Sequence, residues 1–180
     1  MAPEARLDEI DARILEILQR DGRKPYAEIG AEVGMSGPSA HERVKKLEAR
    51  GIIRGYGARI DPLLVGLGVT AYVWVTQAPG TIADDLAPDF ATIPEVEGCH
   101  RIAGEGDYLL KIRAADTLGL EQVVRRIQTT PHVYRTETDI AFSTPFERRP
   151  LPIRPTVETT DAPPNGTAAR PSKSDRQRQA

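Results

Sequence analysis

Apolar positions in the first fifty residues recur at helical spacing. Six of them follow the 3.6-residue period of a first helix, namely Leu7, Ile10, Ile14, Leu15, Ile17 and Leu18. Asp8 is a suitable N-cap for this helix and Gly22 ends the run. A short second helix is predicted for about residues 25–33, because proline suits a first helical turn and two apolar residues four apart can face one core.

The third predicted helix runs from its N-cap Ser36 to Arg50, with Gly51 as its stop. Gly34 supplies the sharp turn that separates it from the second helix, and Gly30 marks where the two helices would cross closely. Two such helices joined by a short glycine-containing turn define a helix-turn-helix. A plain three-helix bundle with a solvated basic face is the alternative, but turn spacing and charge together favour DNA binding.

From residue 69 the pattern changes to strict alternation. Residues 69–76 predict a strand with Val69, Ala71, Val73 and Val75 on one face and Thr70, Tyr72, Trp74 and Thr76 on the other. A helical stretch over 82–93 follows, in which Pro88 implies a kink or a late start. Strands are predicted at 96–103, 107–113 and 133–142, with a helix over 116–127 before the last one. The order β-α-β-β-α-β predicts a ferredoxin-like domain. Either face of the first strand is largely apolar, so the open sheet face predicts at least a dimer.

The predicted fold class is therefore α+β. Residues 1–60 are predicted to form a helix-turn-helix DNA-binding domain, 61–66 a hinge, and 67–149 a ferredoxin-like domain that oligomerises. Residues 150–180 are poor in large apolar side chains and predict a disordered tail. Its weak positive charge would allow nonspecific contact with DNA, but an inert tail is the favoured interpretation.

Charge separates the two domains. Residues 36–60 carry six Lys/Arg against Glu42 and Glu48, whereas residues 61–149 carry eight basic against thirteen acidic residues. Only the first part suits a polyanion. Composition, with 39% hydrophobic and 28% charged residues, is that of a soluble globular protein, and no apolar run could span a membrane. The single cysteine, Cys99, fits a reducing cytoplasm, and with His100 alone it makes no metal site.

Several motifs in correct order carry a family resemblance over about residues 7–149. The first helix matches at Leu7, Asp8, Asp11, Ile14, Leu15, Leu18, Asp21, Gly22 and Arg23. The helix-turn-helix matches at Ile29, Val33, Gly34, Ser36, Ser39, Ala40, Arg43, Val44, Leu47, Glu48, Gly51, Ile52 and Ile53. Gly104, Asp107 and Tyr108, and then Thr136 and Thr138, match two motifs of the second domain. The chain thus resembles the Lrp/AsnC (feast/famine) family of transcription regulators. The resemblance implies that the DNA-binding domain 1–60 is winged-helix-like and that the ferredoxin-like domain 67–149 binds an effector. It further implies a homodimer, often assembled into octamers on the nucleoid, that responds to a small effector, usually an amino acid. No cofactor and no enzymatic activity are expected.

The resemblance implies that the third helix enters the major groove. Residues early in a recognition helix meet base edges and later basic residues meet phosphates. The candidate base readers are Ser39, His41, Glu42 and Arg43. The candidate backbone contacts are Ser36, Lys45, Lys46, Arg50 and Arg54. Arg43 has a second interpretation, a local ion pair that braces the helix, and His41 a second one as a mere surface residue.

The "GEGD" loop is on its own a common hairpin turn. With the resemblance it becomes a predicted amino-acid site, in which glycine backbone N–H groups hold the ligand carboxylate and Asp107 accepts from its ammonium group. The predicted lining residues are His100, Arg101, Ile102, Ala103, Gly104, Gly106, Asp107, Tyr108, Thr136 and Thr138.

Two alternative functions stay open. Some proteins on the same two-domain plan decarboxylate sirohaem with His and Arg side chains, and His100 beside Arg101 would suit that chemistry. The basic third helix argues against it, since an enzyme has no need of that surface. The second alternative is nonspecific architectural binding of DNA. It differs from regulation only in the ratio between the affinity for a specific site and the affinity for other DNA.

Overall fold

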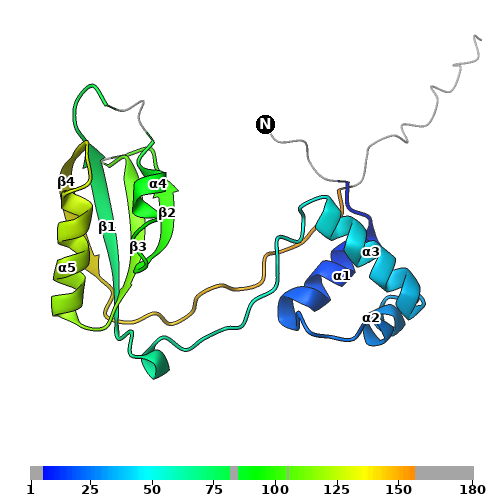
Figure 1. Ribbon diagram of the computed structural model, residues 1–180. Helices are drawn as coiled ribbons and strands as arrows, with labels where there is room; N and C mark the ends of the chain where they lie inside the picture. The colour runs from blue at the N-terminus through cyan, green and yellow to red at the C-terminus, as the bar shows by residue number, and fades with distance from the viewer. Residues whose placement is uncertain (1–5, 82–84, 105, 157–180) are drawn as a thin grey trace, which may run out of the picture. The chain divides into compact units, whose positions relative to one another are not determined.

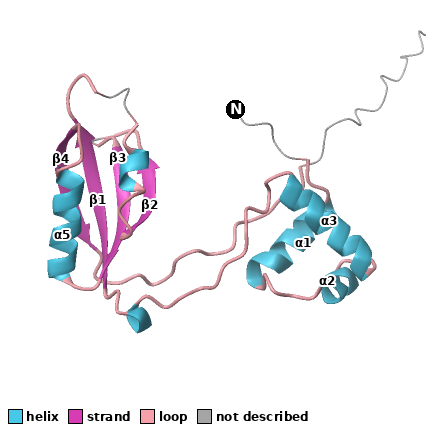
Figure 2. Cartoon of the chain, viewed as in Figure 1, coloured by secondary structure: helices cyan, strands magenta, loops and turns pink. Residues whose placement is uncertain are grey.

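The computed structural model describes residues 6–81, 85–104 and 106–156. The chain forms two compact units, residues 1–57 together with 149–180, and residues 58–148. Within the described residues, the first unit contains helices and the second contains every strand (Figure 2). None of the helices in these ranges is long and apolar enough to cross a membrane.

The helical unit consists of α1 (Glu9–Arg20), α2 (Tyr26–Glu32) and α3 (Gly37–Ala49). Two of its helices start at the predicted caps, because the Asp8 side chain accepts from the Asp11 N–H and the Ser36 side chain accepts from the Ser39 N–H. The core of the unit is apolar throughout: Ile14, Leu15, Ile17, Ile29, Ala40, Val44 and Leu47. The three predicted helices are thus confirmed.

The second unit has the predicted ferredoxin-like arrangement. Its elements are the 3₁₀ turn η1 (Leu63–Val65), β1 (Val69–Gln77), α4 (Ala87–Phe90), β2 (Val96–Arg101), β3 (Tyr108–Ala114), α5 (Thr117–Gln128) and β4 (Val133–Ile140). The strands form one antiparallel sheet in the order β2-β3-β1-β4, so the two strands that begin and end the unit are neighbours (Figure 1). The expected fold class, α+β, is confirmed.

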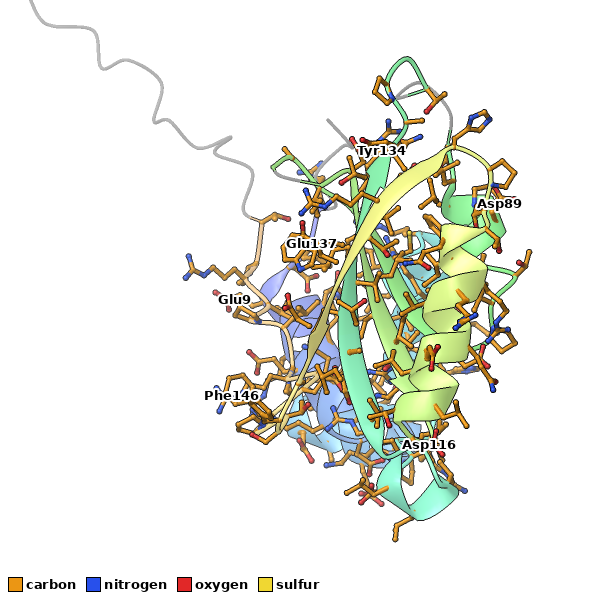
Figure 3. All side chains as sticks on the ribbon, turned by 90° about the vertical axis from the view of Figure 1, so that its left-hand side faces the viewer. Glu9, Asp89, Asp116, Tyr134, Glu137 and Phe146 are labelled. Atoms are coloured by element: carbon orange, nitrogen blue, oxygen red, sulfur yellow. The ribbon has the colours of Figure 1, made fainter. Side chains whose placement is uncertain are left out.

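The two helices cover one face of this sheet and leave the other open. Ala71, Val73 and Val75 of β1 are fully buried together with residues of α4 and α5, such as Phe90 and Leu120. Seen nearly edge-on, the sheet has α5 on one side, while Glu137 of β4 projects from the opposite side (Figure 3). The alternation predicted two faces for β1 but not which of them is covered. The face with Tyr72 and Trp74 is the uncovered one.

Several predicted boundaries differ from the structure. α4 is only four residues long and starts at Ala87, since Pro88 fits only the first turn; the first predicted positions of this helix, 82–84, lie outside the described residues. β4 ends at Ile140, and Phe142 beyond it is fully exposed. Residues 52–60, between α3 and the predicted hinge, form no regular element.

The C-terminal segment departs most from the prediction. Residues 149–156 return to the helical unit, where Ile153 packs against the core and Thr156 bonds to Leu7 (Figure 1, orange). Composition predicts disorder from Pro150, but Ile153 is partly buried against the core and the Leu151 backbone pairs with the Gln19 side-chain amide, and these contacts hold the stretch in place. The remainder of the predicted tail, 157–180, lies outside the described residues.

Candidate nucleic-acid interface and effector loop

The turn between α2 and α3 leaves no room for a side chain at Gly30. A Cβ atom there would lie 2.7 Å from the Met35 carbonyl oxygen and 2.9 Å from the Ser36 carbonyl carbon. Gly34 takes a φ of 73°, and the Met35 N–H donates to the Gly30 carbonyl at 2.8 Å, which closes the end of α2. The turn is thereby tight enough to set α3 firmly against α2.

One side of α3 is buried and the other is free to meet DNA. Ala40, Val44 and Leu47 point into the core and are at most 1% exposed. Four of the predicted contact residues are exposed on the rest of the helix: Ser39, Glu42, Lys45 and Lys46. Lys45 lies 3.8 Å from Glu42, a weak surface pair. These four residues form the candidate reading surface.

Arg43 is paired with two carboxylates at the start of α1. Its guanidinium donates to Asp8 at 2.6 Å and to Asp11 at 2.7 Å, and it thereby ties α3 to the start of α1. Burial opposes ionisation of Asp8, but the Asp11 N–H and the Arg43 guanidinium outweigh it and hold the pKa of Asp8 below its usual value. The structure thus supports the bracing interpretation of Arg43 over the base-reading one.

Three more of the predicted DNA-contact residues bind partners within the helical unit. The His41 ring packs on Tyr26 of α2, with ring centroids 4.5 Å apart. Ser36 is occupied as the N-cap of α3 and also bonds the Ser39 hydroxyl at 2.8 Å. The Arg50 guanidinium donates to the Arg6 carbonyl at 2.6 Å. Arg54 is exposed beyond the end of α3.

The effector loop after β2 is closed by hydrogen bonds around Asp107. The Asp107 carboxylate accepts from the Gln77 N–H at 2.7 Å, and the Asp107 N–H donates to the Val75 carbonyl at 2.9 Å. The Ile102 N–H donates to the Asp107 carbonyl at 3.0 Å. One carboxylate oxygen of Asp107 thus fixes the loop to β1. Ala103 and Gly104 are exposed beside it.

The strand register shows which face of the sheet each of the other predicted effector residues lies on. Arg101, Tyr108, Val75 and Thr136 are partners in one row across the sheet, on the side covered by the helices. Tyr108 is buried there, and its hydroxyl donates to Asp85 and accepts from the Leu86 N–H, both at 3.1 Å. Burial is the main cause that raises the pKa of Tyr108 above its usual value. Tyr108 is therefore part of the core of the sheet unit.

The two threonines share that covered side. Thr136 accepts from the Gln128 amide of α5 at 2.9 Å, and Thr138 pairs with Val73 in the next row. His100 pairs with Leu109 and projects from the open face, opposite to Arg101. His100 and Arg101, the pair on which the decarboxylase alternative rests, therefore point to opposite faces of the sheet.

The open face carries a charged cluster that the sequence did not indicate. Glu97 lies 3.0 Å from Lys111 and 2.9 Å from Arg113, and Glu147 bonds to both of these basic residues. Burial opposes ionisation of Glu97, but its hydrogen bonds to Lys111 and Arg113 prevail and lower its pKa to about 2. Only strand pairing brings these residues together, so no local pattern could have found them.

Comparison with known proteins identifies the same two parts. Residues 7–48 match the AsnC-type helix-turn-helix domain and residues 70–151 match the Lrp/AsnC ligand binding domain. The HTH-type transcriptional regulator LrpA of Mycobacterium tuberculosis is 38% identical over 143 residues, which cover 79% of this chain and 95% of that protein. The chain belongs to the Lrp/AsnC family. LrpC of Bacillus subtilis is also similar, with 36% identity over 74% of this chain and 95% of its own length.

Solved structures agree with this assignment. A feast or famine regulatory protein from M. tuberculosis complexed with L-methionine has a TM-score of 0.75 and 38% identity, over 79% of this chain and 97% of that one. A transcriptional regulator from Neisseria meningitidis, also complexed with L-methionine, has a TM-score of 0.76 and 30% identity, over 81% and 96%. The predicted family, and with it DNA-binding transcriptional regulation of the Lrp/AsnC type, is thereby confirmed. The relatives carry the names of regulators, not of enzymes.

Proposed function

We propose that this regulator reads DNA with the exposed side of α3, through Ser39 and Glu42 at base edges and Lys45 and Lys46 at phosphates. The observation that carries the proposal is the division of α3 into a buried apolar side and an exposed polar one. Arg54, exposed just past the helix, adds a further phosphate contact. Arg43, Arg50, Ser36 and His41 hold the helix in place rather than read the site.

The test is the salt dependence of binding to a duplex from the region upstream of its own gene. Lys46→Ala should lower the slope of log K against log salt by about 0.9 for each chain that binds, since one fewer phosphate is neutralised. Arg125→Ala is the matched control, because Arg125 is an equally exposed basic residue on a helix of the sheet unit. If log K depended on log salt equally in Lys46→Ala and the wild type, α3 would not be the element that binds DNA.

The effector we propose is a free amino acid held at the loop that contains Gly104, Gly106 and Asp107. Backbone N–H groups there would bind its carboxylate, and the Asp107 oxygen that does not hold Gln77 would accept from its ammonium group. The L-methionine complexes of two relatives support an amino acid as the ligand class. Among the other predicted lining residues, Ile102, Ala103 and Arg101 flank this loop, while His100, Thr136 and Thr138 lie on strands leading away from it.

Asp107→Asn tests this site better than Asp107→Ala. Asparagine keeps an oxygen for the Gln77 N–H but removes the charge that an ammonium group needs, so the fold stays while effector affinity falls about tenfold or more. Calorimetric titration with L-methionine and a panel of other amino acids measures the change. The control is Asp116→Asn, which changes a helix-capping carboxylate away from the loop. Unaltered effector affinity in Asp107→Asn would place the sensor site elsewhere.

We further propose that the chain assembles through the open face of the sheet and acts on the nucleoid as a dimer or larger oligomer. Tyr72 and Trp74 supply apolar area on this face, and Trp74 is 36% exposed. Two reading helices in one dimer would bind two half-sites with much greater avidity than either alone.

A further inference from the structure

The docked strap, residues 149–156, is anchored to the DNA-binding unit at both ends of α1. At its start, the Gln19 side-chain amide donates to the Leu151 carbonyl at 3.0 Å, and the Gln19 side-chain oxygen accepts from the Leu151 N–H at 2.6 Å. Further along, Ile153 packs against the core of the unit. The start of the docked strap is therefore fixed to the last turn of α1, which ends at Arg20.

The end of the docked strap closes on Leu7, the residue before the N-cap of α1. The Thr156 N–H donates to the Leu7 carbonyl at 3.0 Å, and the Thr156 hydroxyl accepts from the Leu7 N–H at 2.8 Å. One threonine thus satisfies both backbone groups of Leu7. Because the N–H of a residue ahead of a helix has no partner within the helix, this contact fixes a stretch of backbone that would otherwise be left to water.

Leu7 lies between the two residues that hold α3. On one side of it, the Arg6 carbonyl accepts from the Arg50 guanidinium at 2.6 Å. On the other side, the Asp8 carboxylate accepts from the Arg43 guanidinium at 2.6 Å. Consecutive Cα atoms are only about 3.8 Å apart, so a shift of Leu7 displaces both acceptors with it.

The two arginines held in this way lie on either side of Lys46 in α3. Lys46 follows Arg43 by three residues and precedes Arg50 by four, so the three side chains share one line of the helix. A charge-assisted hydrogen bond to a phosphate has a narrow range of donor–acceptor distances. A small rotation of α3 about its anchors would therefore misplace the exposed residues that meet DNA.

We propose that the docked strap positions α3 for DNA recognition, with Thr156 as the positioning residue. Thr156 fixes Leu7, and Leu7 sets the two neighbouring acceptors that hold Arg50 and Arg43. The expected result of this positioning is specificity, because contacts with base edges require one orientation of the helix, whereas nonspecific attraction to phosphates tolerates a shift. The inference rests on the proposed function, in which α3 reads the DNA.

The experiment compares two duplexes of equal length, one from the region upstream of its own gene and one of random sequence. Thr156→Val in the full-length protein keeps the shape of the side chain but removes the acceptor for the Leu7 N–H. We expect about a three- to tenfold loss of affinity for the upstream duplex, with unchanged affinity and salt slope for the random one. No loss, or an equal loss on both duplexes, would overturn the proposal.

Two matched variants accompany Thr156→Val. Thr156→Ser keeps the hydroxyl and should restore the preference for the upstream duplex. Thr92→Val removes a hydroxyl that bonds a backbone carbonyl in the sheet unit and should leave the preference unchanged. Thermal unfolding shows whether each variant is folded at the temperature of the binding measurement. If Thr156→Val is not, Gln19→Ala takes its place, because it loosens the other end of the docked strap and should reduce the same preference.

A double-mutant cycle tests whether the docked strap acts through the anchors of α3. Arg50→Ala removes the bond to the Arg6 carbonyl. If Thr156 acts through this anchor, the double variant should lose less affinity for the upstream duplex than the product of the two single losses. A loss equal to the full product would mean that Thr156 and Arg50 act independently, and would contradict the proposed route.

Lys46→Ala separates this inference from the proposed function. If Lys46→Ala lowers the salt slope while Thr156→Val leaves the preference between the two duplexes unchanged, α3 reads DNA but the docked strap does not position it. If Lys46→Ala leaves the slope unchanged, or the wild type binds both duplexes equally well, the proposed reading surface is wrong and the positioning role is wrong with it.

Discussion

The Arg43 guanidinium lies 2.7 Å from the carboxylate of Asp11, and this ion pair joins the middle of α3 to the first turn of α1. The Asp11 side chain is only 12% exposed, so without Arg43 its charge would be left nearly buried. Asp8 shares the same guanidinium at 2.6 Å. Asp8 and Asp11 thus both hold α3 against the start of α1 through the Arg43 guanidinium.

Replacement of Arg43 by alanine should act on stability and not on phosphate contacts. We expect Arg43→Ala to lower the free energy of unfolding of the helical unit by about 2 kcal/mol, because a part-buried carboxylate loses a charged partner. Lys45→Ala, at an exposed pair, should change it by less than about 0.5 kcal/mol. Urea denaturation followed by circular dichroism measures both. A lower salt slope for DNA binding in Arg43→Ala would instead show that Arg43 contacts a phosphate.

Gly30→Ala should damage the helix-turn-helix more than a helix propensity scale suggests. Alanine is the better helix former, yet its Cβ would meet backbone atoms of Met35 and Ser36 at 2.7–2.9 Å, and backbone cannot give way easily. We expect a loss of about 2 kcal/mol or more in thermal unfolding of the helical unit. Gly57→Ala is the control, since a Cβ at Gly57 meets nothing within 4 Å. A neutral Gly30→Ala would mean that the turn is looser than the structure has it.

Stability of the sheet unit should fall in acid because of Glu97. Its folded pKa of about 2 lies below the ordinary value of 4.5, so its contribution is complete above pH 4.5 and is lost as the pH falls toward 2. Glu97→Gln should therefore flatten this part of the pH profile, whereas Glu121→Gln, at an exposed pair on α5, should not. Trp74 is the single tryptophan of the chain, and its fluorescence reports on this unit. If the stability of Glu97→Gln and of the wild type depended on pH in the same way, the low pKa of Glu97 would not be the cause of the acid sensitivity.

Trp74→Glu should weaken self-association of the full-length protein. The substitution places a charge in the middle of the open face, directly across from Glu137 of β4, where like charges repel. Sedimentation velocity at micromolar concentration should show a shift toward monomer, about tenfold or more in the dissociation constant. Leu118→Glu, an exposed apolar residue on the covered side, is the control. If Leu118→Glu dissociated the protein and Trp74→Glu did not, the interface would lie on α5.

Much of the fold could be predicted because its signals are local. The caps Asp8 and Ser36, the turn at Gly34 and the alternation over 69–76 each act within a few residues, where backbone geometry and the period of side chains decide the outcome. Element order then limited the sheet to one familiar topology. The family motifs belong to the same local information.

What only the tertiary structure decided concerns residues far apart in the chain. Sequence alone left Arg43 either a base reader or a partner in a local ion pair, because the choice depends on how closely Asp8 and Asp11 approach its guanidinium in the packed unit. Which face of the sheet Tyr72 and Thr136 lie on depends on the register between β1 and β4, two strands that are about sixty residues apart in the chain. The docked strap is held mainly by Gln19 and Leu7, more than 130 residues away, so composition alone predicted disorder where a few distant contacts create order.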